Sequence, residues 1–189
     1  MPNIYVIAGP NGAGKSTMAA RILSRYVDCT EFVNADVIAK DLSASNPESV
    51  AIEAGRRMLR RLDELAEQRV DFAFETTLSS RSFAPWLRKR KSEGYLFHLF
   101  FAWLPDPAMS VTRVALRVAS GGHHVPEADV RRRYERGISN FLELYMGLAD
   151  MWEVYDNSST TQLLARGNRL LTPRIYDQHA WEAFKQRRT

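Results

Sequence analysis

The chain has almost no cysteine and no long apolar run. Cys29 is the only cysteine among 189 residues, which excludes an internal disulfide and a zinc site built from cysteines. No apolar stretch approaches the roughly 20 residues that a helix needs to cross a bilayer. The N-terminus carries no positively charged segment ahead of an apolar one, so we expect no signal peptide. These absences predict a protein of the cytoplasm that does not enter membranes.

Internal repeats, low-complexity tracts and linkers are also missing. A chain of 189 residues is long enough for one well-buried α/β domain and short for two. Hydrophobic residues make up 45% of the sequence and charged residues 25%, as in ordinary soluble globular proteins. We therefore expect a single domain that spans residues 1–189.

Positive charge is in modest excess, with a net charge of +4. The basic residues are scattered in clusters at 56–61, 88–91 and 131–136. The first two clusters lie on segments with amphipathic helical spacing, where a solvated outer face explains them. An enzyme that handles nucleotides also needs arginines. The charge pattern therefore does not favour nucleic acid as a partner.

The most informative segment that the chain does contain is a glycine-rich loop. Residues 9–16 read G-P-N-G-A-G-K-S, directly after the apolar run at residues 4–8. This is the pattern G-x-x-x-x-G-K-[ST], in which backbone N–H groups and a helix N-terminus face the phosphates of a nucleotide. The sequence thus predicts a nucleoside triphosphate site. We expect contacts from Gly9, Pro10, Asn11, Gly12, Ala13, Gly14, Lys15, Ser16 and Thr17.

Within this loop, two side chains have specific expected roles. Lys15 is expected to reach the β- and γ-phosphates, and the hydroxyl of Ser16 is expected to ligate Mg²⁺. The chain has no N-K-x-D motif that would select guanine. We therefore expect ATP, with Mg²⁺, as the bound cofactor.

Strand and helix patterns alternate along the chain. Strand-like runs occur at residues 4–8, 31–34, 71–75, 95–104, 152–156, 161–166 and 170–176. Helical spacing occurs at residues 15–26, 48–69, 80–93, 107–119 and 127–149 and from about 178. This alternation predicts a three-layer α/β sandwich, with a mostly parallel sheet that helices cover on both faces.

Asp36 ends the second predicted strand. Ligands of open α/β sheets lie at the carboxyl ends of the strands. A carboxylate at this edge can accept the proton of an attacking hydroxyl during phosphoryl transfer. It can equally cap the helical turn that begins at Val37-Ile38. The local sequence leaves both interpretations open.

Glu75, Thr76 and Thr77 end the third predicted strand, in the same crevice. Glu75 resembles a Walker B carboxylate, which contacts Mg²⁺ through water. Alternatively, Glu75 and Thr77 hydrogen-bond the acceptor substrate, or the segment is only a strand end with a turn rich in serine and threonine. A carboxylate at the end of a buried strand needs a partner, which favours a function for Glu75.

Two arginine-bearing helical segments flank Gly121 and Gly122. This arrangement predicts a small mobile lid, about residues 117–133, that closes over the triphosphate. Arg117 is our first candidate for stabilising charge on the transferring phosphoryl group, and Arg132 is the second. The adjacent residues His123 and His124 make a poor metal site without further ligands. A phosphate contact and a plain surface loop are equally consistent with them.

Taken together, these segments resemble the zeta-toxin-like family of P-loop kinases. The resemblance depends on residues 9–16, Asn34-Ala35-Asp36, the F-E-T-T-L segment at 74–78 and the lid from Arg117 to Pro126, and it covers roughly residues 3–140. It implies a fold like that of nucleoside-monophosphate kinases and an antitoxin-type protein as a candidate partner. The toxins proper phosphorylate the 3′-hydroxyl of UDP-N-acetylglucosamine.

The resemblance also implies residue roles. Lys15 and Ser16 would serve the triphosphate and Mg²⁺, and Asp36 would be the base acting on the acceptor hydroxyl. Glu75 and Thr77 would bind the acceptor, and Arg117 would bind the γ-phosphate. The family tends to place a second lid arginine shortly before a proline, where this chain has His123. One of the arginines at 131–133 would have to complete the clamp.

The sequence therefore predicts an ATP-dependent phosphotransferase that moves the γ-phosphate to a hydroxyl of a small molecule, with a nucleotide sugar such as UDP-N-acetylglucosamine as the candidate acceptor. The alternative is a nucleotide-dependent ATPase switch that controls binding to a partner protein. An acceptor cavity walled by Asp36, Glu75 and Thr77 would distinguish the kinase from the switch. A kinase acting on a nucleic-acid end would instead show a basic groove leading to Asp36.

Overall fold

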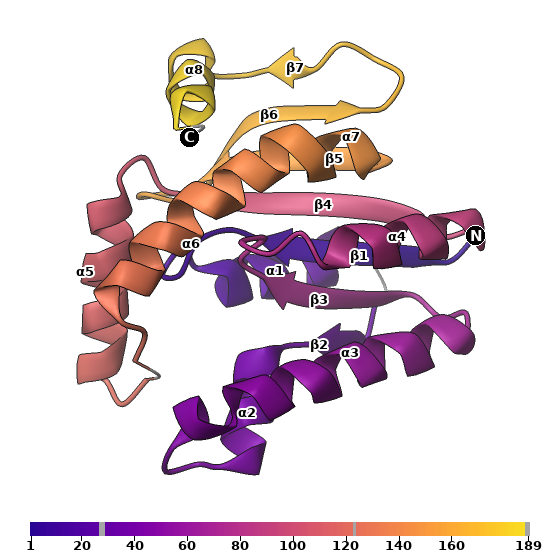
Figure 1. The fold of residues 1–189 in the computed structure, drawn as a ribbon. Helices are drawn as coiled ribbons and strands as arrows, with labels where there is room; N and C mark the ends of the chain where they lie inside the picture. Colours follow the sequence, from indigo (N-terminus) through magenta and orange to yellow (C-terminus); the bar gives the residue numbers. More distant parts are fainter. Residues whose placement is uncertain (27–28, 123, 188–189) are drawn as a thin grey trace.

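The computed structural model describes residues 1–26, 29–122 and 124–187. One seven-stranded sheet runs through it in the order β2-β3-β1-β4-β5-β6-β7 (Figure 1). Its strands are β1 (Asn3–Ala8), β2 (Glu31–Val33), β3 (Phe72–Thr76), β4 (Leu96–Trp103), β5 (Met151–Asp156), β6 (Gln162–Asn168) and β7 (Arg174–Ile175). The first five strands pair in parallel, and β6 and β7 are antiparallel additions at one edge.

Helices cover both faces of this sheet. They are α1 (Lys15–Tyr26), α2 (Ala35–Leu42), α3 (Ala51–Glu67), α4 (Phe83–Ser92), α5 (Pro107–Ala119), α6 (Glu127–Asn140), α7 (Met146–Leu148) and α8 (Gln178–Gln186). In Figure 1, α1 lies behind the sheet and α4 and α6 lie in front of it. The expected three-layer sandwich with a mostly parallel sheet is confirmed. None of these helices is long and apolar enough to cross a membrane within the described ranges.

The central strands are apolar along almost their whole length. In β1, Ile4–Ala8 are at most 8% exposed, and in β4 every residue from Leu99 to Trp103 is buried. Parallel strands covered on both faces need such continuous apolar runs. The paired register of β1 with β3 and β4 brings their carboxyl ends to the same side of the sheet, which is where open α/β sheets bind ligands.

Four local expectations need correction. A full helix, α2, stands where only a turn was expected, and its cap is Asn34, whose Oδ1 accepts a hydrogen bond from the backbone N–H of Asp36 at 2.8 Å. The interpretation of Asp36 as that cap is therefore wrong, because Asp36 lies inside the first turn. The helix expected at 127–149 contains a π-helical turn at Phe141–Tyr145, and the last strand shortens to Arg174–Ile175.

Candidate functional site

The glycine-rich loop joins β1 to α1 at the carboxyl edge of the sheet. Gly9 has a φ of +137°, and a Cβ there would lie 2.2 Å from the carbonyl oxygen of Ala102. Gly12 has a φ of +76°, and its Cβ would lie 2.9 Å from the carbonyl oxygen of Ser110. Only glycine combines these backbone angles with such close approaches. The loop therefore curls tightly between β4 and α5, and α1 begins at Lys15.

The β5–β6 connection supports the loop from the other side. Asn157 donates from Nδ2 to the carbonyl oxygen of Ala13 at 2.5 Å. Arg113 of α5 donates to the carbonyl oxygens of Asn157 and Ser158 at 2.9 and 2.6 Å. Arg113 therefore holds the connection against the loop. No sequence pattern predicted this role of Asn157.

Lys15 is folded back into the site. Its side chain is 7% exposed, and its Nζ donates to the carbonyl oxygen of Pro10 at 3.0 Å. The same Nζ lies 3.6 Å from Oε1 of Glu75. Burial lowers the pKa of Lys15, while the negative charges of Glu75 and Asp36 act in the opposite direction. The Lys15 ammonium group is thus buried at the carboxyl ends of the strands, where it contacts Pro10 and Glu75.

Glu75, near the end of β3, links the start of α1 to the residue that follows β2. Its Oε2 accepts hydrogen bonds from Ser16 Oγ at 2.7 Å and from Asn34 Nδ2 at 3.0 Å. With the Lys15 contact, the carboxylate has three partners, two from the start of α1 and one from the cap of α2. Glu75 therefore has the partners that its position demands. Asn34, at the end of β2, both caps α2 and orients this carboxylate.

The oxygen atoms around Ser16 suit a magnesium ion that is also bound by the oxygens of a triphosphate. The Ser16 hydroxyl and the Glu75 carboxylate present two oxygen atoms that lie 2.7 Å apart. Magnesium prefers oxygen and keeps several waters and phosphate oxygens, so it needs few protein ligands. No group of three or more His, Cys, Asp or Glu side chains that could hold a metal occurs in the described part of the chain. The residues present fit an ion shared with the nucleotide rather than one caged by protein.

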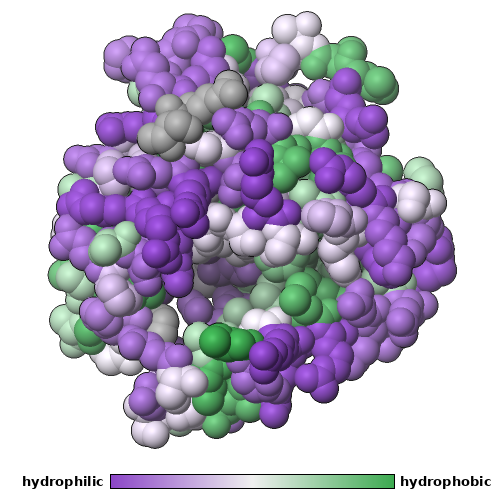
Figure 2. Space-filling model, in the orientation of Figure 1, coloured by the Kyte–Doolittle hydropathy of each residue, from purple (hydrophilic) through white to green (hydrophobic). Residues whose placement is uncertain are grey.

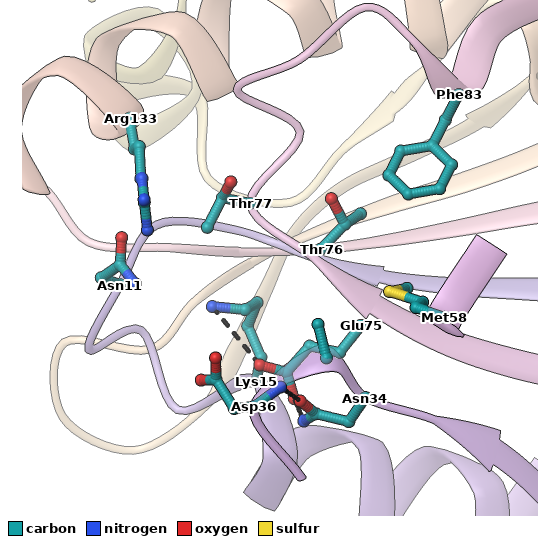
Figure 3. A pocket seen from close by; sticks show the side chains of 11 residues that line it. Asn11, Lys15, Asn34, Asp36, Met58, Glu75, Thr76, Thr77, Phe83 and Arg133 are labelled. Carbon is teal, nitrogen blue, oxygen red and sulfur yellow. Dashed lines mark hydrogen bonds and ion pairs between the residues drawn. The ribbon is translucent and has the colours of Figure 1, made fainter. Parts of the chain in front are cut away.

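A cavity of about 230 Å³ opens beside Lys15. Figure 3 shows a polar end, where Lys15, Asp36, Glu75 and Asn34 converge, and an apolar end formed by Met58 and Phe83. The complete lining is Asn11, Lys15, Asn34, Ala35, Asp36, Met58, Glu75, Thr76, Thr77, Phe83 and Arg133. In the space-filling view, a hollow opens on this face between the surface over α6 and the surface over α2 and α3 (Figure 2). Five residues predicted for the site are therefore brought together: Asn11, Lys15, Asp36, Glu75 and Thr77.

The arginine of α6 that lines the cavity is not the one that we expected. Arg133, in the first half of α6, points into the cavity toward Asn11 (Figure 3). Arg132 instead pairs with Asp129 at 2.8 Å and does not line this cavity. Arg117 lies in the last turn of α5, half-buried, and its charge contributes to the lowered pKa of Lys15. His123, predicted to replace a lid arginine, lies outside the described residues.

Several site residues carried only weak sequence signals. Asn11 was expected in the phosphate loop, but its amide also faces the cavity, where Oδ1 is buried without a hydrogen-bond partner among the described residues. Met58 and Phe83 read as ordinary core positions of their helices. Arg133 is one of three consecutive arginines, and nothing in the sequence singles it out.

Comparisons with known proteins identify one family and several similar folds. A family model described as Zeta toxin matches residues 1–169. An uncharacterised protein of Haemophilus influenzae is 32% identical over 127 residues, which cover 67% of this chain and 88% of that protein.

Among solved structures, an AvrRxo1-ORF1:AvrRxo1-ORF2 complex with sulphate ions contains a chain that matches with a TM-score of 0.80 at 15% identity. That match covers 100% of this chain but only 65% of the other. A second matched chain belongs to the PezAT chromosomal toxin-antitoxin system of Streptococcus pneumoniae, with a TM-score of 0.67 at 13% identity, covering 99% of this chain and 78% of that one. At these identities the likeness shows a shared fold.

Proposed function

Because the chain belongs to the zeta toxin family, we propose that it is an ATP-dependent phosphotransferase that moves the γ-phosphate to a hydroxyl of a small molecule. Family membership supports ATP binding and P-loop kinase chemistry in general. The acceptor half of the proposal depends on one observation, the cavity beside Lys15 that Asp36, Glu75 and Thr77 line. A nucleotide-dependent switch needs no such cavity, so the cavity favours the kinase over the switch.

The donor side is the phosphate loop. Residues 9–17 would hold the triphosphate, and Lys15 would exchange its contact with Pro10 for the β- and γ-phosphates. Ser16 and Glu75 would hold Mg²⁺, which, when bound, neutralises charge on the phosphates. Arg117 and Arg133 would stabilise the charge of the transferring group from the lid side. Arg132 already pairs with Asp129. It would have to break this ion pair, through a movement of the lid, to take the same role.

The acceptor side is centred on Asp36. Its carboxylate would take the proton of the acceptor hydroxyl as the oxygen of that hydroxyl bonds to the γ-phosphorus. The bond between the γ-phosphorus and the bridging oxygen breaks, and ADP leaves. Positioning supplies most of the rate, because phosphoryl transfer asks little covalent chemistry of the protein. The buried Oδ1 of Asn11 offers an acceptor atom that a ligand hydroxyl would satisfy.

The substrate and the lid remain parts of the proposal. We propose a nucleotide sugar such as UDP-N-acetylglucosamine as acceptor, since the cavity combines a polar end with an apolar end at Met58 and Phe83. Residues of about 117–133 would form the lid, turning at Gly121, whose φ is +80°.

An antitoxin-type protein is a proposed partner, supported by the likeness to a chain of the PezAT toxin-antitoxin system. Co-purification with the product of a neighbouring reading frame would test that partner.

Mass spectrometry tests the proposed reaction directly. The chain is incubated with ATP, Mg²⁺ and a panel of nucleotide sugars, nucleosides and free sugars, and each acceptor is examined for the mass gain of one phosphate. Asp36→Asn should lower the transfer rate about 10²-fold or more while ATP binding, measured separately, stays intact. Asp41→Asn is the matched control on the same helix, outside the cavity. ATP hydrolysis with no phosphorylated acceptor would favour the switch instead.

A further inference from the structure

A series of hydrogen bonds through the β5–β6 connection ends on the phosphate loop. Nη1 of Arg21 donates to the hydroxyl of Thr161 at 3.1 Å, and that hydroxyl donates to Oδ1 of Asn157 at 2.6 Å. Nδ2 of Asn157 then donates to the carbonyl oxygen of Ala13 at 2.5 Å. A guanidinium group can only donate, and a carbonyl oxygen can only accept. The series therefore runs in one direction, which fixes the orientation of the Asn157 amide.

The backbone of Asn157 is held in place as well as its side chain. Its N–H donates to the carbonyl oxygen of Trp103, the last residue of β4, at 2.9 Å. Its carbonyl oxygen and that of Ser158 accept from the guanidinium group of Arg113 at 2.9 and 2.6 Å. A movement of Asn157 away from the loop would therefore break several hydrogen bonds at once, to β4 and to α5.

The hydrogen bond from Asn157 decides which way the peptide group between Ala13 and Gly14 faces. A trans peptide group is planar and places its C=O and its N–H on opposite sides. Because the carbonyl of Ala13 points at Asn157, the N–H of Gly14 points away from Asn157 and into the curl of the loop. Inward-facing N–H groups are what such a loop presents to a phosphate.

The surroundings of Gly14 agree with this role. Its φ is +74°, and a Cβ there would lie 2.6 Å from Nδ2 of Asn157, so the close contact with Asn157 requires a glycine. The N–H of the preceding residue, Ala13, donates to the carbonyl oxygen of Pro10 at 3.2 Å. Within residues 1–26, 29–122 and 124–187, no carbonyl accepts from the N–H of Gly14. That N–H is therefore available to a phosphate oxygen.

We propose that Asn157 is a positioning residue of the nucleotide site, which holds the peptide between Ala13 and Gly14 so that the N–H of Gly14 faces the phosphates. Arg113 acts through Asn157, because it holds the backbone of the connection. Without the Asn157 donor, this peptide can rotate and turn the carbonyl oxygen of Ala13 toward the phosphates, which repel it. The inference rests on the nucleotide-binding half of the proposed function and adds a residue far from the phosphate loop in the sequence.

Asn157→Asp tests the donor while it keeps the size of the side chain. A carboxylate cannot donate to the carbonyl of Ala13 and repels it. Calorimetric titration with ADP and Mg²⁺ should show an affinity lower by about tenfold or more, as expected for the loss of a hydrogen bond to a charged group. Adenosine carries no phosphate, so its affinity should be the same in the variant and in wild type. A variant whose fold is merely weakened would lose affinity for both ligands equally.

Ser159→Ala is the matched control in the same connection. Ser159 is exposed, and its side chain makes no hydrogen bond within the described ranges, so the variant should bind ADP as wild type does. Arg113→Ala should weaken ADP binding less than Asn157→Asp does, because Arg113 acts only through the connection. Combined with Asn157→Asp, it should weaken ADP binding little further, since two residues that act through one peptide group are not additive.

Steady-state kinetics separate this role from one on the acceptor side. Asn157→Asp should raise the KM for ATP and leave the KM for the acceptor unchanged, because Asn157 does not line the acceptor cavity. ADP affinity unaffected by Asn157→Asp, or equal losses of affinity for ADP and adenosine, would overturn the inference. ADP binding that depends on Asn157, in a protein that phosphorylates no acceptor, would support the inference and contradict only the proposed phosphotransfer reaction.

Discussion

The side-chain amide of Asn140 donates a 2.7 Å hydrogen bond to the backbone carbonyl of Leu78, in the buried contact between α6 and the loop that follows β3. Leu78 has a φ of +54°, a conformation that a leucine adopts only at an energetic cost. The hydrogen bond satisfies a carbonyl that this turn would otherwise leave buried and unpaired. Helix α6 thus fixes the loop that follows Thr77, which lines the proposed acceptor cavity.

Gly137→Ala should destabilise this contact. A Cβ at Gly137 would lie 2.6 Å from the carbonyl oxygen of Thr77, so α6 or the loop must shift. We expect a loss of about 1–3 kcal/mol in the free energy of unfolding and a raised KM for the acceptor. Chemical denaturation and steady-state kinetics measure the two effects. Gly55→Ala is the control, since a Cβ there meets nothing within 4 Å and should stabilise α3 by up to about 1 kcal/mol. Equal effects of the two substitutions would contradict the tight contact.

Glu75→Gln should remove most of the phosphotransfer activity. The substitution keeps the size of the side chain but removes the charge that faces Lys15 at 3.6 Å and accepts from Ser16 at 2.7 Å. We expect a fall in kcat of about 10²-fold or more, together with a requirement for higher Mg²⁺ concentrations. Titration of the transfer rate with Mg²⁺ checks both. Glu53→Gln, at an exposed ion pair on α3, should leave the rate unchanged, and a Glu75→Gln enzyme with wild-type Mg²⁺ dependence would exclude the proposed metal contact.

The sequence predicted the fold class because its signals are local. Alternating apolar strands and amphipathic helices, with a phosphate loop after the first strand, specify a parallel sheet covered on both faces. The site residues at strand ends, Asp36 and Glu75, follow from the same pattern. The order of the strands in the sheet was not predicted, because it depends on pairing between segments far apart in the chain.

The choice between Arg132 and Arg133 shows where sequence reasoning stops. Successive residues on a helix point about 100° apart, so one of three neighbouring arginines faces the cavity, and the rotation of α6 decides which. That rotation is fixed by Gly137 against Thr77 and by Asn140 against Leu78, contacts between segments about 60 residues apart. The π-helical turn at Phe141–Tyr145 also has no local signature that periodicity could detect.

Alkaline pH should destabilise the fold through buried tyrosines, of which Tyr134 and Tyr145 are two. Burial raises the pKa of Tyr134 and of Tyr145 from 10.0 to about 12. Between pH 10 and 12 the unfolded chain releases these protons while the folded chain keeps them, so the stability that the two hydroxyls contribute is complete below pH 10 and is lost as pH rises toward 12. Urea titrations at several pH values would measure this slope.

The hydroxyl of Tyr145 also donates to the carbonyl of Ser80, so Tyr145→Phe should be less stable than wild type at pH 8. Its stability should nevertheless fall less steeply between pH 10 and 12, because one of the linked protons is gone. Tyr134→Phe should flatten the slope in the same way, and the double variant should flatten it further. Variants that keep the wild-type slope would show that other groups cause the alkaline loss.

Helix α8 should be essential for stability although the family match ends at residue 169. Phe184 is fully buried, and its ring centroid lies 5.6 Å from those of Phe101, Trp103 and Phe141. Phe184→Ala should therefore cost about 3–5 kcal/mol in the free energy of unfolding. Leu170→Ala, at a side chain that is 91% exposed, should cost less than about 0.5 kcal/mol. If denaturation midpoints of the two variants coincide, α8 does not belong to the cooperative core; if only Phe184→Ala shifts, the folded unit extends beyond the residues that the family shares.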